Sequence, residues 1–362
     1  MISLLIFLFI LSTLIIVHES GHFIIAKRTG VRVEKFSLGF GPRLLKKKKG
    51  GTEYSISAIL LGGYVKLAGD NLEEYKGGPD EYFSKPPGKR FWIIFCGPLL
   101  NYLLGFLFFW LVFFAGYPTL TTRVGGLIDG FGAKQAGLQE GDKIIAVDGQ
   151  KVDFWEELQN IIRAKKTATK VLVSVLRDNK EQKIEVSIRE KQLSDPLGEA
   201  RNVGLLGITP YYDEIVKVRY GLAQSFIMGI KKTWELTATT YKGLWRMVTG
   251  KLLIRESVTG PLGILYIASK TARAGIIAVL HLMAVLSIGL GIFNLLPLPV
   301  LDGGHIVLLG IEKIRGRVLS LKAEQIVTQV GTTIIMSLAI FVTYNDILRL
   351  FGDKISKFFV SR

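Results

Sequence analysis

The chain has 362 residues, of which 49% are hydrophobic, and its 46 Lys+Arg against 30 Asp+Glu give a formal charge of +16. The mean hydropathy is +0.36, which excludes an ordinary single soluble domain because the apolar residues must then occur in continuous blocks. The basic residues cluster beside these blocks, which favours a lipid bilayer over nucleic acid as the partner of the positive charge. The single cysteine, Cys96, excludes an intrachain disulfide.

Residues 1–26 begin with seventeen uncharged residues and are predicted to form a retained transmembrane helix, since no cleavage site for a signal peptide follows. The span ends in His18-Glu19-Ser20-Gly21-His22, an H-E-x-x-H motif. Two histidines four residues apart share one face of a helix, so both imidazoles can bind one metal ion while Glu19 acts as a general base. The alternative is a group of polar residues at a helix end that reach toward water.

Residues 27–90 hold fourteen Lys+Arg against seven Asp+Glu, a density that predicts a cytoplasmic loop. The run Lys46–Lys49 is predicted to contact anionic lipid headgroups, with substrate tails as the alternative. Gly62 and Gly63 either allow another backbone to approach closely or form an ordinary hairpin turn.

Three further spans are predicted, at residues 91–116, 275–309 and 326–350, so that four spans place both termini outside. The third is interrupted between Asn294 and Gly304 by two prolines and two glycines. Irregular backbone survives at membrane depth only where it is buried in protein or lines a wet cavity, so this stretch predicts a site.

Asp302 lies in that stretch and could complete a zinc site of two histidines and one aspartate. His281 has no polar residues near it in the sequence and is predicted to pack between helices. His305, one turn past Asp302, is a candidate to hydrogen-bond one of the ligands.

Residues 118–191 are predicted to form a small extracytoplasmic domain. Ala136-Gly137-Leu138 and the strand that ends at Asp148-Gly149 precede a helix at 154–164 and two strands, 170–177 and 182–189. The pattern resembles a PDZ (α+β) domain, and an unclassified β-rich domain is the alternative. Residues 202–209 either complete its sheet or form a separate strand.

Residues 192–274 are predicted to form a juxtamembrane or interfacial segment. Aromatic and basic residues mix between 213 and 251, as is typical of a helix at the membrane interface. A lid under the PDZ domain is the alternative.

In chain order these motifs resemble the site-2 protease family of intramembrane zinc metalloproteases, and within it the bacterial RseP/RasP type. The resemblance is carried by HESGH (18–22), SLGFGPRL (37–44), LLGGYVKLAG (60–69), CGPLLNYLL (96–104), the PDZ pattern and NLLPLPVLDGGH (294–305). It implies that His18, His22 and Asp302 bind Zn²⁺ and that Glu19 is the general acid and base. It also implies that Asn294 and the strand residues Gly62, Gly63 and Tyr64 bind the unwound substrate.

The fold implied is a polytopic α-helical membrane protein with four transmembrane helices, a membrane-associated β-hairpin and an inserted extracytoplasmic PDZ domain. The activity implied is cleavage of transmembrane protein substrates, such as an anti-sigma factor or a remnant signal peptide, in the bacterial inner (cytoplasmic) membrane. The active site would face the cytoplasmic side, and the PDZ domain would act as a size filter or bind a C-terminal peptide. The enterobacterial RseP type has two tandem PDZ domains, whereas this chain has room for one.

Two other functional classes fit part of the pattern. A non-catalytic membrane scaffold could use the PDZ domain to bind partners, and a zinc transporter or sensor could use intramembrane His and Asp. Neither of them needs Glu19, so this residue discriminates between them and a protease.

Overall fold

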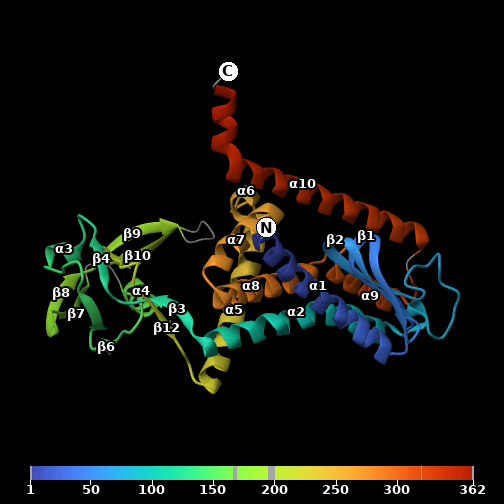
Figure 1. The fold of residues 1–362 in the computed structure, drawn as a ribbon, viewed down its shortest axis with the longest axis horizontal. Coiled ribbons are helices and arrows are strands. Elements are labelled where there is room, and N and C mark those ends of the chain that lie inside the picture. Colours follow the sequence, from blue (N-terminus) through green and yellow to red (C-terminus); the bar gives the residue numbers. More distant parts are fainter. Residues whose placement is uncertain (1, 166–168, 195–199, 319, 361–362) are drawn as a thin grey trace. The chain divides into compact units, whose positions relative to one another are not determined.

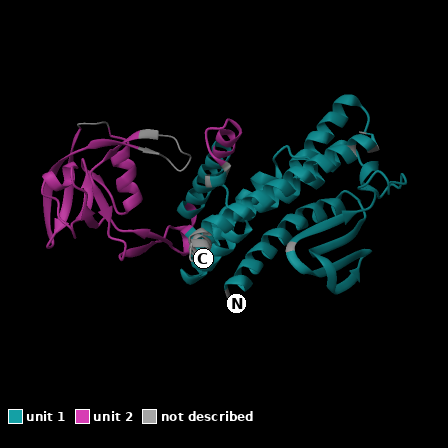
Figure 2. Ribbon diagram, turned by 90° about the horizontal axis from the view of Figure 1, so that it is seen from above, with its two compact units in different colours: residues 1–112, 224–242, 254–362 teal, residues 113–223, 243–253 magenta. Residues whose placement is uncertain are grey.

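The computed structural model describes residues 2–165, 169–194, 200–318 and 320–360 (Figure 1). The chain divides into two compact units (Figure 2). Unit 1 comprises residues 1–112, 224–242 and 254–362, and unit 2 comprises residues 113–223 and 243–253.

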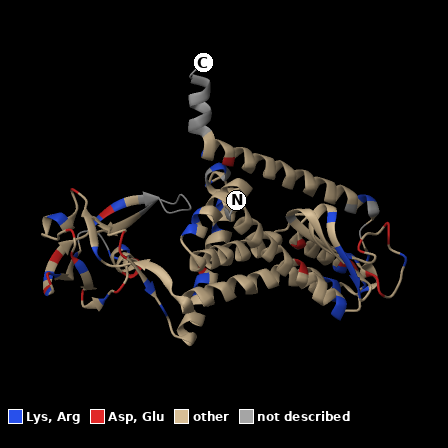
Figure 3. Cartoon of the chain, in the orientation of Figure 1, with Lys and Arg blue, Asp and Glu red and all other residues tan. Residues whose placement is uncertain are grey.

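Four helices in the described part of unit 1 are long and apolar enough to cross a membrane. They are α1 (Ile2–Arg28), α2 (Pro87–Ala115), α8 (Ile276–Asn294) and α10 (Leu321–Val360). In Figure 3 these helices are mostly tan, with few charged residues along their middles. Leu5 and Phe9 of α1 are exposed, as expected of side chains that face lipid. The four apolar spans expected from the sequence are therefore present as helices.

Helices α1 and α2 pack against each other in antiparallel directions. Ala26 near the end of α1 shares a core with Ile93 near the start of α2, while Leu14 lies in a cluster that Leu104 packs against. Gly21 permits the closest approach, because a Cβ added there would lie 2.2 Å from the carbonyl oxygen of Cys96.

The third predicted span, 275–309, is two helices joined by irregular backbone. Helix α8 ends at Asn294, and α9 (Asp302–Arg315) begins eight residues later. A Cβ on Gly303 would lie 2.3 Å from the carbonyl oxygen of Leu295, and one on Gly304 would lie 2.1 Å from that of Leu298. The two glycines therefore let the connecting segment fold back on the first turn of α9. Asp302 lies at the start of this helix and not inside the irregular stretch.

Strands β1 (Val33–Lys49) and β2 (Thr52–Leu67) turn at Gly50-Gly51 and pair with each other along bent paths. Ser37 pairs with both Ser55 and Tyr64, so the first half of β1 lies between the two ends of β2. The predicted hairpin is present, and its sheet is wider than expected because the second half of β2 pairs with the other side of β1. Gly62 and Gly63 lie inside β2, and the alternative of a turn at these glycines is wrong.

The remaining parts of unit 1 pack against these spans. They include the short helices η1 (Tyr82–Ser84), α6 (Ile254–Ser257) and α7 (Pro261–Arg273). The buried Asp346 of α10 accepts hydrogen bonds from the N–H groups of Gly260 (3.2 Å) and Gly263 (2.8 Å), which fastens α10 to the first turn of α7.

Helix α5 (Leu222–Val248) belongs to both units, and its residues 224–242 pack on α2. A Cβ on Gly229 would lie 3.2 Å from the backbone nitrogen of Trp110, and the Tyr102 and Thr237 hydroxyls are 2.7 Å apart. The expected mixed aromatic and basic segment at 213–251 is therefore largely helical.

Unit 2 contains a four-stranded antiparallel sheet in the order β6-β5-β7-β8. The elements of unit 2 as a whole are, in chain order, β3 (Tyr117–Leu120), β4 (Val124–Leu127), α3 (Gly132–Gln135), β5 (Lys143–Val147), β6 (Gln150–Lys151), α4 (Trp155–Arg163), β7 (Lys170–Arg177), β8 (Lys180–Ser187), β9 (Arg189–Ser194), β10 (Ala200–Leu205), β11 (Ile208–Pro210) and β12 (Ile215–Val218). The predicted turn at Asp148-Gly149 is present, and both residues have positive φ, as a tight hairpin turn requires.

The segment expected to be juxtamembrane, 192–274, is divided by the structure. Strand β11 pairs with β4, and β12 pairs with β3, so the chain up to Val218 is part of unit 2. Residues 202–209 therefore supply strands to this unit.

Candidate metal centre

Three side chains from distant parts of unit 1 meet at one point. The ligand atoms of His18 and His22 on α1 and of Asp302 on α9 all lie within 4.8 Å of one another. The two Nε2 atoms are 3.2 Å apart, and Asp302 Oδ2 and Oδ1 lie 3.2 Å and 3.6 Å from Nε2 of His18 and His22. The H-E-x-x-H motif and the aspartate, 280 residues apart in the sequence, thus form one cluster of metal-ligand type.

His22 is held by a neighbouring helix. Its Nδ1 lies 2.8 Å from the carbonyl oxygen of Ile93 on α2. When Nδ1 carries the proton and donates it to this carbonyl, the lone pair of Nε2 points into the cluster, as is usual for a metal-binding histidine. Gly97 leaves the room that the ring needs, since a Cβ there would lie 2.3 Å from Nε2 of His22.

Asp302 owes its position to the start of α9. It occupies the first turn of that helix, where free backbone N–H groups stabilise a carboxylate. The far end of α9 is fixed by an ion pair between Glu312 and the buried guanidinium of Arg90 on α2. Arg90 also lies over the rings of Tyr82 and Phe83, at 5.7 Å and 5.5 Å from their centroids.

The donor set fits a zinc ion. Ligands 2.0–2.2 Å from a tetrahedral zinc lie about 3.3–3.6 Å from one another, close to the separations seen here. When both Nε2 atoms are unprotonated, their lone pairs and the carboxylate repel one another, and a cation between them removes this repulsion. Catalytic zinc sites use three such protein ligands and leave a fourth position open.

Glu19 is adjacent to the cluster without being part of it. Its carboxylate lies near the backbone of Val65 in β2. A Cβ on Gly63 would lie 3.3 Å from Cγ of Glu19 and 2.7 Å from Ile15. The glycine therefore allows β2 to lie directly against the helix that carries the H-E-x-x-H motif.

The other residues singled out in the sequence lie at different distances from the cluster. Tyr64 stacks on Phe40 within the sheet, with centroids 6.1 Å apart. Asn294 is the half-buried last residue of α8. His305 is exposed and is not one of the three clustered residues. His281 contacts the Phe109 ring at 5.4 Å, consistent with packing between helices.

Sequence reasoning missed the contribution of α2 to the site. Ile93 and Gly97 support His22 through a backbone carbonyl and a missing side chain, and neither feature has a sequence pattern of its own. The available signals were Gly97-Pro98 in the middle of an apolar span, where both residues are unfavourable for a helix, and the motif CGPLLNYLL (96–104), to which no role was assigned.

Comparison with known proteins agrees with this geometry. A sequence profile of peptidase family M50 matches residues 6–338. The chain belongs to peptidase family M50. A candidate zinc metalloprotease of Agrobacterium fabrum is 32% identical, and the match covers 96% of both chains. This family M50 member is therefore a zinc metalloendopeptidase and a multi-pass membrane protein.

Two longer relatives carry more specific names. The zinc metalloprotease RasP of Geobacillus kaustophilus is 29% identical over 427 aligned positions, which cover 96% of this chain and 98% of that one. The regulator of sigma E protease of Haemophilus influenzae is 27% identical, with coverages of 95% and 98%. The family M50 member described here, at 362 residues, lacks some of the positions that these relatives have.

Among solved structures, the PDZ domain of an SdrC-like protein from Listeria innocua aligns with 25% of this chain and 93% of its own, at 24% identity and a TM-score of 0.21.

Proposed function

We propose that this M50 peptidase hydrolyses a peptide bond inside a transmembrane segment of another membrane protein. His18, His22 and Asp302 would hold the zinc ion, and Glu19 would carry the proton. The observation that supports this best is the meeting of the three ligand atoms within 4.8 Å on membrane-spanning and interrupted helices. Glu19 next to His18 then has the position of a general base.

The chemistry divides between the metal and the chain. Bound zinc polarises a carbonyl group and lowers the pKa of water, so that a nucleophile is available near neutral pH. Glu19 accepts the proton of the attacking water and passes it to the amine that leaves. The backbone of Val65 in β2 lies near the Glu19 carboxylate. Asn294, at the end of α8, would bind the backbone of the substrate.

Strand β2 supplies a surface for the unwound substrate. Residues 63–67 pair with β1, and Gly63 lies close to Ile15 and Glu19 of α1. A peptide bond in a helix is shielded by its own hydrogen bonds, so a substrate must unwind and find new partners. An extended substrate that pairs near Gly63 and Tyr64 would satisfy its backbone close to Glu19.

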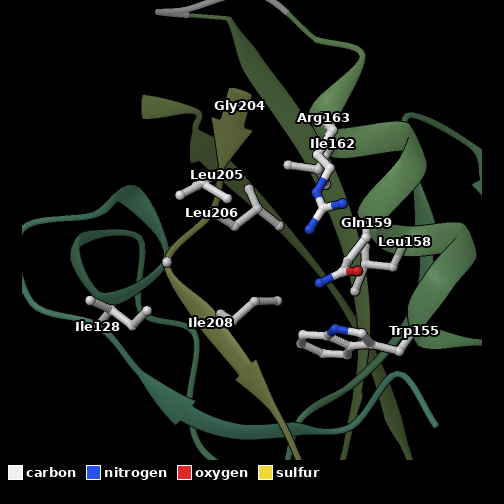
Figure 4. A pocket seen from close by; sticks show the side chains of 11 residues that line it. Ile128, Trp155, Leu158, Gln159, Ile162, Arg163, Gly204, Leu205, Leu206 and Ile208 are labelled. Atoms are coloured by element: carbon white, nitrogen blue, oxygen red, sulfur yellow. The ribbon is translucent and has the colours of Figure 1, made fainter. Parts of the chain in front are cut away.

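Unit 2 offers a groove of the kind that PDZ domains use. Apolar residues of α4, together with Gln159 and Arg163, face the segment 204–208 across an open groove (Figure 4). Within the described residues β11 pairs only with β4, so its other edge is open for an added strand. We propose that this unit is a PDZ domain that binds a C-terminal peptide, with the terminal carboxylate close to Arg163. Its alternative role as a size filter stays a prediction.

The orientation in the bacterial inner membrane follows from the charges of the loops. The basic residues of 27–90, including the exposed Lys46–Lys49 run, would lie in the cytoplasm against lipid headgroups. Unit 2 would lie outside the cytoplasm. An anti-sigma factor or a remnant signal peptide would then present its transmembrane segment to the zinc site.

The test compares four purified proteins in detergent: wild type, Glu19→Gln, His22→Ala and Asp302→Asn. We expect about one zinc per chain in wild type and Glu19→Gln, and loss of zinc in the two ligand variants. Cleavage of a transmembrane substrate should fall by about 10²–10⁴-fold in Glu19→Gln, because general acid and base catalysis contributes that much. Full cellular function of Glu19→Gln would instead indicate a scaffold, a transporter or a sensor.

A further inference from the structure

We infer that Asn101 of α2 is a positioning residue for His18. Its side-chain Oδ1 accepts a hydrogen bond from one buried water molecule, which in turn accepts the Nδ1–H of the His18 imidazole, and thereby turns Nε2 toward the metal. The inference rests on the proposed role of His18 as a ligand. It gives α2 a second function beside the support of His22.

The register of the two antiparallel helices brings these residues together. Ile93 packs near Ala26, and its carbonyl accepts from His22, while Gly97 lies directly against the His22 ring. Each step of four residues toward the end of α2 corresponds to four residues toward the start of α1. The next turn after the contact of Gly97 with His22 therefore places Asn101 opposite His18.

Both partners are buried and have unused hydrogen-bonding atoms. Asn101 is 0% exposed. Within the described part of the chain neither its Oδ1 nor its Nδ2 has a hydrogen-bond partner, and the buried Nδ1 of His18 has none either. A buried amide and a buried imidazole nitrogen are rarely left without partners in folded proteins. The register that places Asn101 opposite His18 would give each of them the partner that it lacks.

The rest of Asn101 is already fixed by a third helix. Ser287 of α8 donates a hydrogen bond of 2.7 Å to the backbone carbonyl of Asn101. A Cβ on Gly291 would lie 3.0 Å from the carbonyl oxygen of Pro98, so α8 and α2 are tightly packed here. The α2–α8 contact thus uses the backbone at this position and leaves the amide side chain for another purpose.

The two metal-binding histidines would then be oriented in the same way. A histidine that binds a metal almost always donates its other ring N–H to an oxygen acceptor, which fixes the tautomer and strengthens the ligand. His22 has this acceptor in the Ile93 carbonyl. Asn101 Oδ1, through the buried water molecule, is the corresponding acceptor for His18.

The test measures the zinc dissociation constant by competition with a chelator on purified full-length protein. Asn101→Leu keeps the branched shape of the side chain, with a somewhat larger volume, and removes the acceptor, so we expect an affinity about 10–100-fold weaker. Asn101→Asp keeps an acceptor oxygen and should stay near wild type. Ser287→Ala removes the hydrogen bond to the Asn101 backbone and serves as the packing control, with unchanged affinity. The visible spectrum of the Co²⁺-substituted protein should change in Asn101→Leu alone.

Several outcomes would overturn the inference. Wild-type affinity and spectrum in Asn101→Leu would contradict it, and equal losses in Asn101→Leu and Asn101→Asp would show that the residue acts through packing. His18→Ala separates this inference from the proposed function. If His18→Ala loses zinc while Asn101→Leu retains it, only the role of Asn101 is wrong; if His18→Ala also retains zinc, the ligand set itself is wrong.

Discussion

Gly97 contributes to the site because it has no side chain. The ring of His22 occupies the space that any side chain at this position would need, and a Cβ there would lie 2.3 Å from Nε2. Contacts under 3.0 Å of this kind force a neighbour to move, and the neighbour here is a proposed zinc ligand. The site therefore depends on a glycine that carries no chemical function.

We predict that Gly97→Ala lowers zinc affinity by at least about tenfold although alanine is the better helix former. The added methyl group displaces the His22 imidazole from its position against Ile93. Gly289→Ala in α8 is the matched control, because a Cβ there meets nothing within 4 Å. Zinc content after dialysis against a weak chelator measures both variants. Equal zinc retention in the two would show that His22 can bind from another position.

The ligand candidates could be found from the sequence because their signals are local. His18, Glu19 and His22 form a motif with helical spacing, and Asp302 lies beside prolines and glycines that are out of place in a membrane span. Ile93 and Asn101 could not be found in this way. Ile93 acts through its backbone carbonyl, and the role of Asn101 depends on the register between α1 and α2.

At the scale of elements, the ion pair between Arg90 and Glu312 sets where α9 can lie. The two side chains are 3% and 13% exposed, and the Arg90 Nε also donates to the Lys85 carbonyl at 3.0 Å. Since Asp302 is on the same helix as Glu312, the pair contributes to the position of the proposed ligand. Removal of one partner leaves a buried charge without its counter-charge.

We expect Arg90→Leu to destabilise the protein by about 3–5 kcal/mol, and the double variant Arg90→Leu/Glu312→Leu to recover much of that loss. Thermal unfolding in detergent can be followed with a thiol-reactive dye, because the single cysteine, Cys96, is buried in the folded state. A double variant as unstable as the single one would show that Arg90 acts through packing on Tyr82 and Phe83.

In unit 2 a similar pair predicts a dependence on pH. Burial raises the pKa of the Asp142 carboxyl, but hydrogen bonds from Arg177 and from the Gln139 N–H outweigh it, and this pKa lies below its ordinary value. A carboxylate with a lowered pKa stabilises the fold fully above its unfolded pKa of about 3.9, and the effect is lost as pH falls through the folded pKa.

Asp142→Asn should therefore destabilise unit 2 at pH 7, and its difference from wild type should shrink as the pH falls below about 4. Hydrogen exchange of the β5 and β7 amides in the full-length protein, corrected for intrinsic rates, measures this difference. Glu140→Gln, at an exposed position two residues earlier, is the control. A difference that is constant with pH would contradict the role assigned to the Asp142 charge.

The elements themselves were predictable to different degrees. The turn at Asp148-Gly149 and helix α4 follow from local signals and are present as expected. The double pairing of Ser37 with Ser55 and Tyr64 could not be derived, because strand register within a bent sheet is set by long-range contacts.

For the whole molecule, the charge distribution predicts on which side each part lies. We expect a cysteine at Lys48, in a Cys96→Ala background, to be shielded from a membrane-impermeant maleimide in spheroplasts and to react after lysis. A cysteine at the exposed Glu181 of β8 should react before lysis. The reverse pattern would show that the zinc site opens toward the other side of the membrane.

The central claim is that this chain cuts inside a membrane, and the position of the cut tests it most directly. A single-span substrate is reconstituted in vesicles with wild type or Glu19→Gln, and the masses of the products give the scissile bond. If the chain cuts inside the membrane, this bond lies within the apolar segment of the substrate, and Glu19→Gln gives about 10²–10⁴-fold less product. A cut in a soluble loop, or an equal yield of product from Glu19→Gln, would contradict this.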